Sequence, residues 1–319
     1  MLVRFWGTRG SLAAPLTVPG VRAKIREALR RSVGKDLSSD DKIEHFLDTE
    51  LDFINAGTFG GNTSCVEIDG GGDEHVVCDM GTGAREYGNA IMSKSLPEKK
   101  PFFNVFQSHP HWDHICGFPF FVPAYIPGNR VIIHGCHDDL EAAFRAQHSA
   151  PGFPVDFELL GADIEFVTHE PGKQFTVAGL NITAMRQHHS GDSYGYRFEK
   201  NGKTVIYSTD SEHKFEEINQ SYDFVQFFQD ADLLIFDAMY SLADAISLKE
   251  DWGHSSNIIG VELAHRAKVK QLCLYHHDPN SSDAEIARIL AETIRFEELS
   301  EEGDSLKICA AYDGQEIRL

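Results

Sequence analysis

The strongest constraint on this chain is a six-residue segment that carries four potential metal ligands, namely His109, His111, Asp113 and His114. Imidazole and carboxylate are the ligand types that zinc and similar divalent ions favour. The segment follows an apolar stretch, 104–107, that is typical of a buried strand, and we expect a helix or turn to begin at Ile115. A strand-to-helix turn of this kind can direct two ligands at one ion and two at its neighbour.

The other histidines of the chain are also grouped. The sequence contains 16 histidines, and outside the motif they include the pairs 188–189 and 276–277, with His254 before the second pair. The pairs lie next to apolar runs that read as strands, and side chains at the ends of neighbouring strands meet at one edge of a sheet. The pattern therefore indicates a metal site assembled from distant segments.

The order of strand and helix patterns predicts an α/β protein. We expect strands at 2–6, 64–69, 75–79, 103–107, 131–134, 164–168, 180–186, 193–199, 203–208, 233–236 and 272–275. We expect helices at 84–93, 138–147 and 283–299, and a further helix capped by Ser255 or Ser256. Residues 20–54 change from basic to acidic, and we interpret them as a helical insertion. Because no linker or fixed-period repeat interrupts the chain, we expect residues 1–319 to form one domain.

The arrangement His109-x-His111-x-Asp113-His114 resembles the signature of the metallo-β-lactamase superfamily. The resemblance continues along nearly the whole chain, because Asp79 in the segment 78–83, His189, Asp210 and His276 follow in the order of that family. It implies a four-layer αββα sandwich in which two mixed β-sheets carry helices on their outer faces.

The resemblance also implies two divalent metal ions that share a hydroxide. His109, His111 and His189 would hold one ion, Asp113, His114 and His276 would hold the other, and Asp210 would bridge them. The spacing to Gly195 favours His189 over His188, and the strand-end position favours His276 over His277, with both alternatives left open. A histidine-rich site suits Zn²⁺, while the two aspartates also admit Mn²⁺ or Fe²⁺.

Two features indicate which branch of the superfamily the chain resembles. True β-lactamases usually carry a cysteine at the bridging position, so Asp210 disfavours antibiotic hydrolysis. The segment 252–256 resembles the His-Ser-Thr motif of ribonuclease Z-like phosphodiesterases, with Ser256 in place of the threonine. In that branch the histidine, here His254, gives a proton to the leaving oxygen, and Glu212 is our candidate for its carboxylate partner. The implied catalytic residues are Asp113, Asp210 and His254.

The charge of the chain bears on the substrate. Lysine and arginine number 29 against 49 acidic residues, a net charge of −20, which disfavours nucleic acid as a partner. We therefore expect a metal-dependent phosphodiesterase that acts on a small-molecule phosphodiester such as a cyclic nucleotide. A tRNA 3′-processing endonuclease of the ribonuclease Z type and a lactone or thioester hydrolase on the same metal site remain alternatives. A non-catalytic sensing module would be expected to lose ligands, which this chain has not done.

Several side chains near the motifs allow two interpretations. Arg9 and Arg85 can offer positive charge, and the segment 60–64 can offer hydrogen bonds, but we favour roles in turns for all of them. The aromatic residues after the motif can line a base pocket or belong to the core, and we favour the core. They are Trp112, Phe118, Phe120, Phe121 and Tyr125.

Composition also suggests a cellular setting. No apolar run approaches the roughly 18 residues of a membrane span, and the first residues lack the pattern of a signal peptide. The six cysteines form no C-x-x-C pair, so we expect reduced thiols and a cytoplasmic enzyme with no membrane partner. Relatives in this branch are often dimers, so a homodimer is one expected assembly, with the helical insertion as an interface or a lid.

Overall fold

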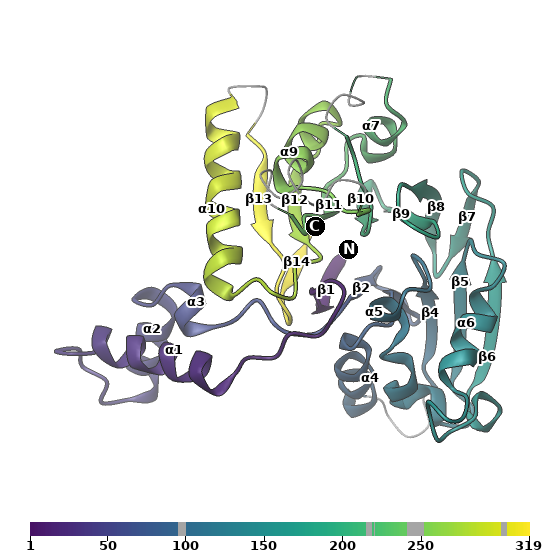
Figure 1. Ribbon diagram of the computed structural model, residues 1–319, viewed down its shortest axis with the longest axis horizontal. Coiled ribbons are helices and arrows are strands. Elements are labelled where there is room, and N and C mark those ends of the chain that lie inside the picture. The colour runs from purple at the N-terminus through teal and green to yellow at the C-terminus, as the bar shows by residue number, and fades with distance from the viewer. Residues whose placement is uncertain (95–99, 215–218, 220, 241–251, 301–304) are drawn as a thin grey trace.

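The computed structural model describes residues 1–94, 100–214, 219, 221–240, 252–300 and 305–319 and contains two seven-stranded sheets (Figure 1). The first sheet has the strand order β14-β1-β2-β3-β4-β5-β6, and the second has the order β13-β12-β11-β10-β9-β8-β7. Strands β3 to β6 are parallel, as are β10 to β13, and the other neighbouring strands are antiparallel. Both sheets are therefore mixed.

The strands of the first sheet are β1 (Leu2–Gly7), β2 (Cys65–Asp69), β3 (His75–Cys78), β4 (Phe102–Phe106), β5 (Arg130–Gly135), β6 (Asp163–Thr168) and β14 (Glu316–Arg318). Those of the second are β7 (Gln174–Val177), β8 (Leu180–Gln187), β9 (Ser193–Lys200), β10 (Lys203–Ser208), β11 (Leu233–Asp237), β12 (Gln271–Tyr275) and β13 (Lys307–Ala310).

The described α-helices are α1 (Val18–Arg31), α2 (Asp40–Thr49), α3 (Phe53–Ala56), α4 (Gly83–Lys94), α5 (Trp112–Ile115), α6 (Leu140–Gln147), α7 (Asp223–Phe228), α9 (Asn257–Arg266) and α10 (Asp283–Ser300). Three short 3₁₀ helices are η1 (Phe118–Phe120), η2 (Val122–Tyr125) and η3 (Phe157–Leu159). Ser256 is the N-cap of α9, and its side chain accepts a hydrogen bond from the amide of Ile259.

Three apolar clusters join the layers. One contains inward-facing residues of both sheets, such as Phe5 and Ile182. A second packs α7, α9 and α10 on the outer face of the second sheet, and a third packs α4, α6, η1 and η2 on the outer face of the first. Burial of apolar surface in these clusters is the main force that holds the layers together. The predicted four-layer αββα sandwich is confirmed.

The differences from the expected elements are local. Strands β7, β13 and β14 were not expected from the sequence. Each has four residues or fewer and lies at a sheet edge, and so short a segment shows no clear apolar alternation. Helix α5 begins at Trp112 rather than at Ile115, so Asp113 and His114 lie on its single turn.

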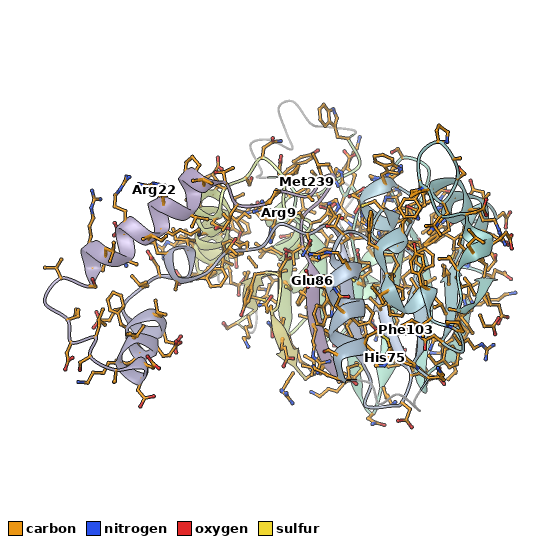
Figure 2. The ribbon with its side chains drawn as sticks, turned by 90° about the horizontal axis from the view of Figure 1, so that it is seen from below. Arg9, Arg22, His75, Glu86, Phe103 and Met239 are labelled. Atoms are coloured by element: carbon orange, nitrogen blue, oxygen red, sulfur yellow. The ribbon has the colours of Figure 1, made fainter. Side chains whose placement is uncertain are left out.

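Helices α1 to α3 occupy the stretch in which we expected a helical insertion, and they project from the two sheets (Figure 1). Thr17 caps α1 and Pro19 lies in its first turn, which explains where the helix begins. Lys24 ties α1 to the rest of the protein, because its Nζ donates to the carbonyl of Gly57 at 2.9 Å and lies 2.6 Å from Asp283 Oδ2. The side chain of Arg22, by contrast, points away from the sheets (Figure 2).

No helix among the described residues has the length and apolar character that a membrane crossing requires.

The interior between the sheets contains a buried histidine whose protonation is opposed by the fold. The ring of His134 stacks on Phe106 at 4.7 Å, and its nitrogens lie 3.0 Å from His169 Nε2 and 3.2 Å from Asn104 Oδ1. Burial, reinforced by the neighbouring His169, lowers the pKa of His134 to about 3. An unfolded chain would bind a proton at this position below about pH 6.5, whereas the folded chain would not.

We predict that His134→Gln flattens the acid side of the stability profile. Because the pKa of His134 is depressed in the folded state, the neutral ring contributes its full share to the free energy of unfolding above about pH 6.5. That share is lost as the pH falls towards 3. Between pH 7 and pH 5 the unfolding free energy of the wild type should fall by about 2 kcal/mol more than that of the variant. Urea unfolding at the two pH values measures this, with His45→Gln on α2 as the control, and equal losses in all three proteins would contradict the prediction.

Candidate metal centre

The structure gathers seven side chains from distant segments at the carboxyl ends of the central strands. His109 follows β4, Asp210 follows β10, His276 follows β12, and His189 lies between β8 and β9. The other three residues belong to the segment after β4. The seven are His109, His111, Asp113, His114, His189, Asp210 and His276, all of which the sequence had indicated as ligands.

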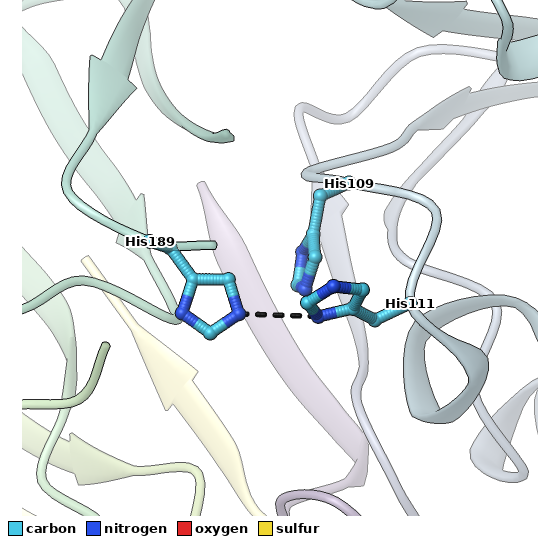
Figure 3. Close-up of side chains that lie close together, drawn as sticks. All are labelled: His109, His111 and His189. Carbon is cyan, nitrogen blue, oxygen red and sulfur yellow. Dashed lines mark hydrogen bonds between the residues drawn. The ribbon is translucent and has the colours of Figure 1, made fainter. Parts of the chain in front are cut away.

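The first group consists of three histidines (Figure 3). Ligand atoms of His109, His111 and His189 all lie within 4.8 Å of one another. His189 Nε2 lies 3.1 Å from His111 Nδ1, and the His109 ring lies beside both. The three imidazoles thus point at one place from two sides of the site.

The second group combines two imidazoles with two carboxylates. Ligand atoms of Asp113, His114, Asp210 and His276 lie within 4.8 Å of one another, and all four side chains are buried. Asp113 Oδ2 lies 3.2 Å from His114 Nε2 and 3.3 Å from His276 Nε2.

Asp210 faces both groups with different oxygens. Its Oδ1 lies 3.1 Å from His114 Nε2 and 3.1 Å from His276 Nε2. Its Oδ2 lies 3.6 Å from His109 Nε2 and 3.6 Å from His189 Nε2. One carboxylate therefore connects the two groups.

These distances fit cation binding better than hydrogen bonding. Two ligand atoms at about 2.05 Å from one tetrahedral cation lie about 3.3 Å apart, close to the separations in both groups. His109 Nε2 and His114 Nε2 are buried and have no hydrogen-bond partner among the described residues. A buried polar atom without a partner costs free energy, and a divalent cation would remove that cost.

Outer hydrogen bonds orient the imidazoles. His114 Nδ1 donates to Asp79 Oδ2 at 2.7 Å, and His189 Nδ1 donates to the carbonyl of Gly253 at 2.8 Å. In each case the proton on Nδ1 leaves Nε2 as the basic nitrogen that faces the group. Asp79 is held in turn by Ser108 and Tyr207, whose hydroxyls donate to its Oδ2 at 2.7 and 2.6 Å.

The electrostatics of the site favour ionised carboxylates, neutral imidazoles at His109 and His111, and a protonated imidazole at His114. Burial and the neighbouring histidines lower the pKa of His109 well below its ordinary value, and burial and His189 lower the pKa of His111. Burial opposes ionisation of Asp210 and Asp113, but the adjacent imidazoles outweigh it and hold the pKa of both carboxyls below the usual range. Burial likewise opposes protonation of His114, yet the carboxylates around it raise its pKa. A cation that binds to His114 would displace the proton from its imidazole.

The adjacent histidines lie elsewhere. His188 is exposed, and its ring lies 5.7 Å from that of Phe224. His277 is buried on the far side of its strand end, where its Nε2 donates to the carbonyl of Ala311 at 2.9 Å. Neither is a member of the two groups.

His254 lies against the same site. Its ring centre lies 5.2 Å from the ring centres of both His189 and His276. Its Nδ1 lies 2.8 Å from Asp237 Oδ2. Burial disfavours the imidazolium, but the attraction of Asp237 and its hydrogen bond outweigh burial and raise the pKa of His254 to about 9.

Glu212 was the wrong choice of partner for His254, because its Oε2 accepts a hydrogen bond from the Gly253 amide at 3.0 Å instead. Asp237 was missed in the sequence. The available signal was its position as the first polar residue after the apolar run 233–236, the same strand-end position that Asp79 and Asp210 occupy.

The glycine-containing loops near the site have structural roles. Arg9 is buried and donates to the carbonyls of Gly60, Asp278 and Ser281, so it is not a free charge for a substrate. Ser11 is closer to the chemistry, because its amide donates to Asp113 Oδ2 at 2.8 Å. Arg9 therefore has a structural role in a turn, as we favoured from the sequence.

Comparison with known proteins identifies relatives. Residues 75–277 match a family model described as a β-lactamase superfamily domain. No curated protein matches the chain. The metallo-β-lactamase fold protein YhfI from Bacillus subtilis is 17% identical, with a TM-score of 0.65 over 99% of this chain and 98% of its own.

Two further solved structures are similar over their whole length. A diphosphatase of the PhnP family is 18% identical, with a TM-score of 0.60 over 100% of this chain and 97% of its own. The short form of human tRNase Z is 17% identical, with a TM-score of 0.58 over 100% of this chain and 99% of its own. At these identities the likeness establishes a common fold.

We predict that Gly10→Ala weakens metal binding. A methyl group at position 10 would lie 2.5 Å from Cε1 and Nδ1 of His276, so the ring would have to leave the position in which its Nε2 faces Asp113 and Asp210. The dissociation constant for Zn²⁺, measured by competition with a chelator, should rise by about 10- to 100-fold, as for loss of an orienting contact. Gly72→Ala is the control, because its methyl group meets nothing closer than 3.9 Å. Unchanged affinity in a folded Gly10→Ala protein would contradict the prediction.

Proposed function

The chain belongs to the metallo-β-lactamase superfamily, whose members are metal-dependent hydrolases, and from this premise we propose that it hydrolyses a small phosphodiester. The position of Asp210 carries the proposal. Its two oxygens face separate groups of imidazoles at 3.1 and 3.6 Å, which suits a carboxylate shared by two cations. Paired divalent cations are the recurrent means of hydrolysing phosphate esters.

The proposed ligand sets follow from the two groups. His109, His111 and His189 hold one cation, Asp113, His114 and His276 hold the second, and Asp210 contributes one oxygen to each. The preponderance of imidazole favours Zn²⁺, with Mn²⁺ and Fe²⁺ as alternatives. When bound, the cations would offset the charge of a phosphodiester and lower the pKa of the attacking water.

The role of His254 distinguishes phosphodiester hydrolysis from other reactions. When water attacks phosphorus and the P–O ester bond breaks, the departing alkoxide needs a proton. His254 supplies it, because Asp237 holds Nδ1 at 2.8 Å and leaves Nε2 as the donor on the site side. Asp237 also stabilises the protonated ring before the transfer. Two structural relatives, a diphosphatase and a tRNase, support phosphate esters as the substrate class.

A tRNA 3′-processing endonuclease is the second candidate. The projecting helix α1 favours it, because Arg22, Arg26 and Arg30 line a surface groove of about 480 Å³ and can contact phosphates. The net charge of −20 over the whole chain favours the small substrate instead.

The deciding experiment is a substrate panel with metal-replete protein. We expect turnover of 2′,3′-cyclic AMP and bis(p-nitrophenyl) phosphate and none of a lactone or a thioester. Cleavage of a tRNA precursor at much higher efficiency would favour the second candidate, and turnover of the acyl substrates alone would refute both.

We predict that Asp210→Ala loses both metal and activity. Removing the shared carboxylate takes one ligand from each cation, so bound Zn²⁺ should fall below two equivalents per chain and kcat/KM by more than about 100-fold. Elemental analysis and the phosphodiester assay measure the two effects, with the exposed Asp48→Ala on α2 as the control. Full turnover by a metal-replete Asp210→Ala protein would refute the assignment.

We also predict that the effect of His254→Ala depends on the leaving group. A ribose alkoxide needs a proton and a nitrophenolate does not, so kcat for 2′,3′-cyclic AMP should fall by about 10²- to 10⁴-fold and that for bis(p-nitrophenyl) phosphate by far less. Steady-state kinetics on the two substrates measure the difference, with His45→Ala as the control. An equal loss on both substrates would show that His254 is not the proton donor.

A further inference from the structure

Two tryptophans beside the metal centre are unusually exposed. Among the aromatic residues that follow the metal-binding motif, Phe118 and Phe121 are buried in the core, as expected. Trp112, by contrast, exposes 79% of its surface, and Trp252 exposes 63%. Tryptophan is a large, mainly buried residue in folded proteins, so two indoles in water next to a reactive site require a reason.

Both tryptophans are attached directly to residues that build the site. Trp112 opens α5 and stands between His111 and Asp113, one from each group. Trp252 precedes Gly253, whose carbonyl accepts from His189 Nδ1 at 2.8 Å. His111 Nδ1 lies 3.1 Å from His189 Nε2, so the two segments that carry the tryptophans meet at this contact. Both exposed tryptophans therefore stand on segments that build the metal centre.

A cavity adjoins the same part of the site. It has a volume of about 590 Å³, within the range of about 300 to 1,000 Å³ that is usual for small-molecule pockets. His189 and Gly253 belong to its wall as well as to the metal centre. Its charged side chains are Arg186, Lys214, Asp192 and Glu212, and groups of this kind can bind the hydroxyls of a sugar.

Resting on the proposed function, we propose that Trp112 and Trp252 determine specificity by receiving a nucleobase, which makes the substrate a nucleotide phosphodiester rather than an aliphatic one. A base presents a flat π-face to an indole whatever its hydrogen-bonding pattern, and such stacking contributes strongly to binding. In the proposed complex, the phosphate binds at the cations and the sugar enters the cavity. The base stacks on the indoles and is thereby removed from water. An aliphatic ester would gain little from either tryptophan.

The first test measures binding without turnover. Adenosine 5′-monophosphate and ribose 5-phosphate share the phosphate and the sugar and differ only in the base, and neither is a phosphodiester. Isothermal titration calorimetry on the metal-loaded protein should show tighter binding of the adenosine compound. Trp112→Ala and Trp252→Ala should each raise its Kd by about 5- to 150-fold, and leave the Kd of ribose 5-phosphate unchanged.

Two further variants guard against indirect effects. Trp112→Phe and Trp252→Phe keep an aromatic face and should retain part of the preference for adenosine 5′-monophosphate. Leu29→Ala on the projecting helix α1 removes a similarly exposed apolar side chain away from the site and should change neither Kd. Circular dichroism verifies that the exposed positions tolerate the substitutions.

The second test separates this inference from the proposed function. With 2′,3′-cyclic AMP, the alanine variants should raise KM and leave kcat within a few-fold, and with the uncharged-headgroup ester glycerophosphoglycerol both constants should stay unchanged. Hydrolysis of both esters with no selective rise in KM would overturn the role of the tryptophans and leave the phosphodiesterase standing. Failure of the wild type on every phosphodiester would overturn the proposed function, while the calorimetry would still decide whether the indoles bind a base. Equal weakening of adenosine 5′-monophosphate and ribose 5-phosphate would overturn the inference.

Discussion

The structure depends on the burial of four carboxylates at one end of a two-sheet sandwich. Asp79, Asp113, Asp210 and Asp237 are each less than a tenth exposed, and together they would repel one another in a dry interior. Imidazoles separate them, and each carboxylate lies against at least one ring. Such an arrangement is stable only if positive charge accompanies it, which protonated imidazoles such as His114 and His254 or a bound cation can supply.

The backbone at this edge is strained in the same places. The backbone φ angles are positive at Asp79, Asp210 and His276, with values of 59°, 29° and 59°. Residues other than glycine rarely adopt this region. All three are the first or second residue after a central strand, and the unusual φ turns the chain sharply there. Strain of this kind persists only where the surroundings fix it, and here the hydrogen bonds of the buried carboxylates do so. The strand ends therefore aim their side chains inward at a conformational cost that cation binding can offset.

The sequence was sufficient for the fold and for the convergence of the ligands, because both are encoded locally. Apolar strands that end within three residues of His109 or His276 predict a common sheet edge, and the motif of residues 109–114 supplies four side chains in one short segment. The pairing of His254 was not local. Asp237 approaches it because the chain just after β11 pairs with the segment that carries His254, through the bridge between Tyr240 and Ser256. The pattern of no single strand reveals such a pairing. Glu212, chosen for its closeness to Asp210 along the chain, is directed to Gly253 instead.

The strong negative charge of the protein limits what can enter the site. At physiological salt the field of a surface charge fades within about 8 Å, so attraction of an anion must originate close to the reacting phosphate. On the proposed assignment, two divalent cations bring four positive charges, of which Asp113 and Asp210 neutralise two. That local excess suits a singly charged phosphodiester, whereas a long polyanion would also meet the acidic remainder of the surface. With electrostatic binding restricted to one phosphate, the rest of the affinity has to come from uncharged contacts, and the exposed indoles beside the cations are the side chains suited to supply them.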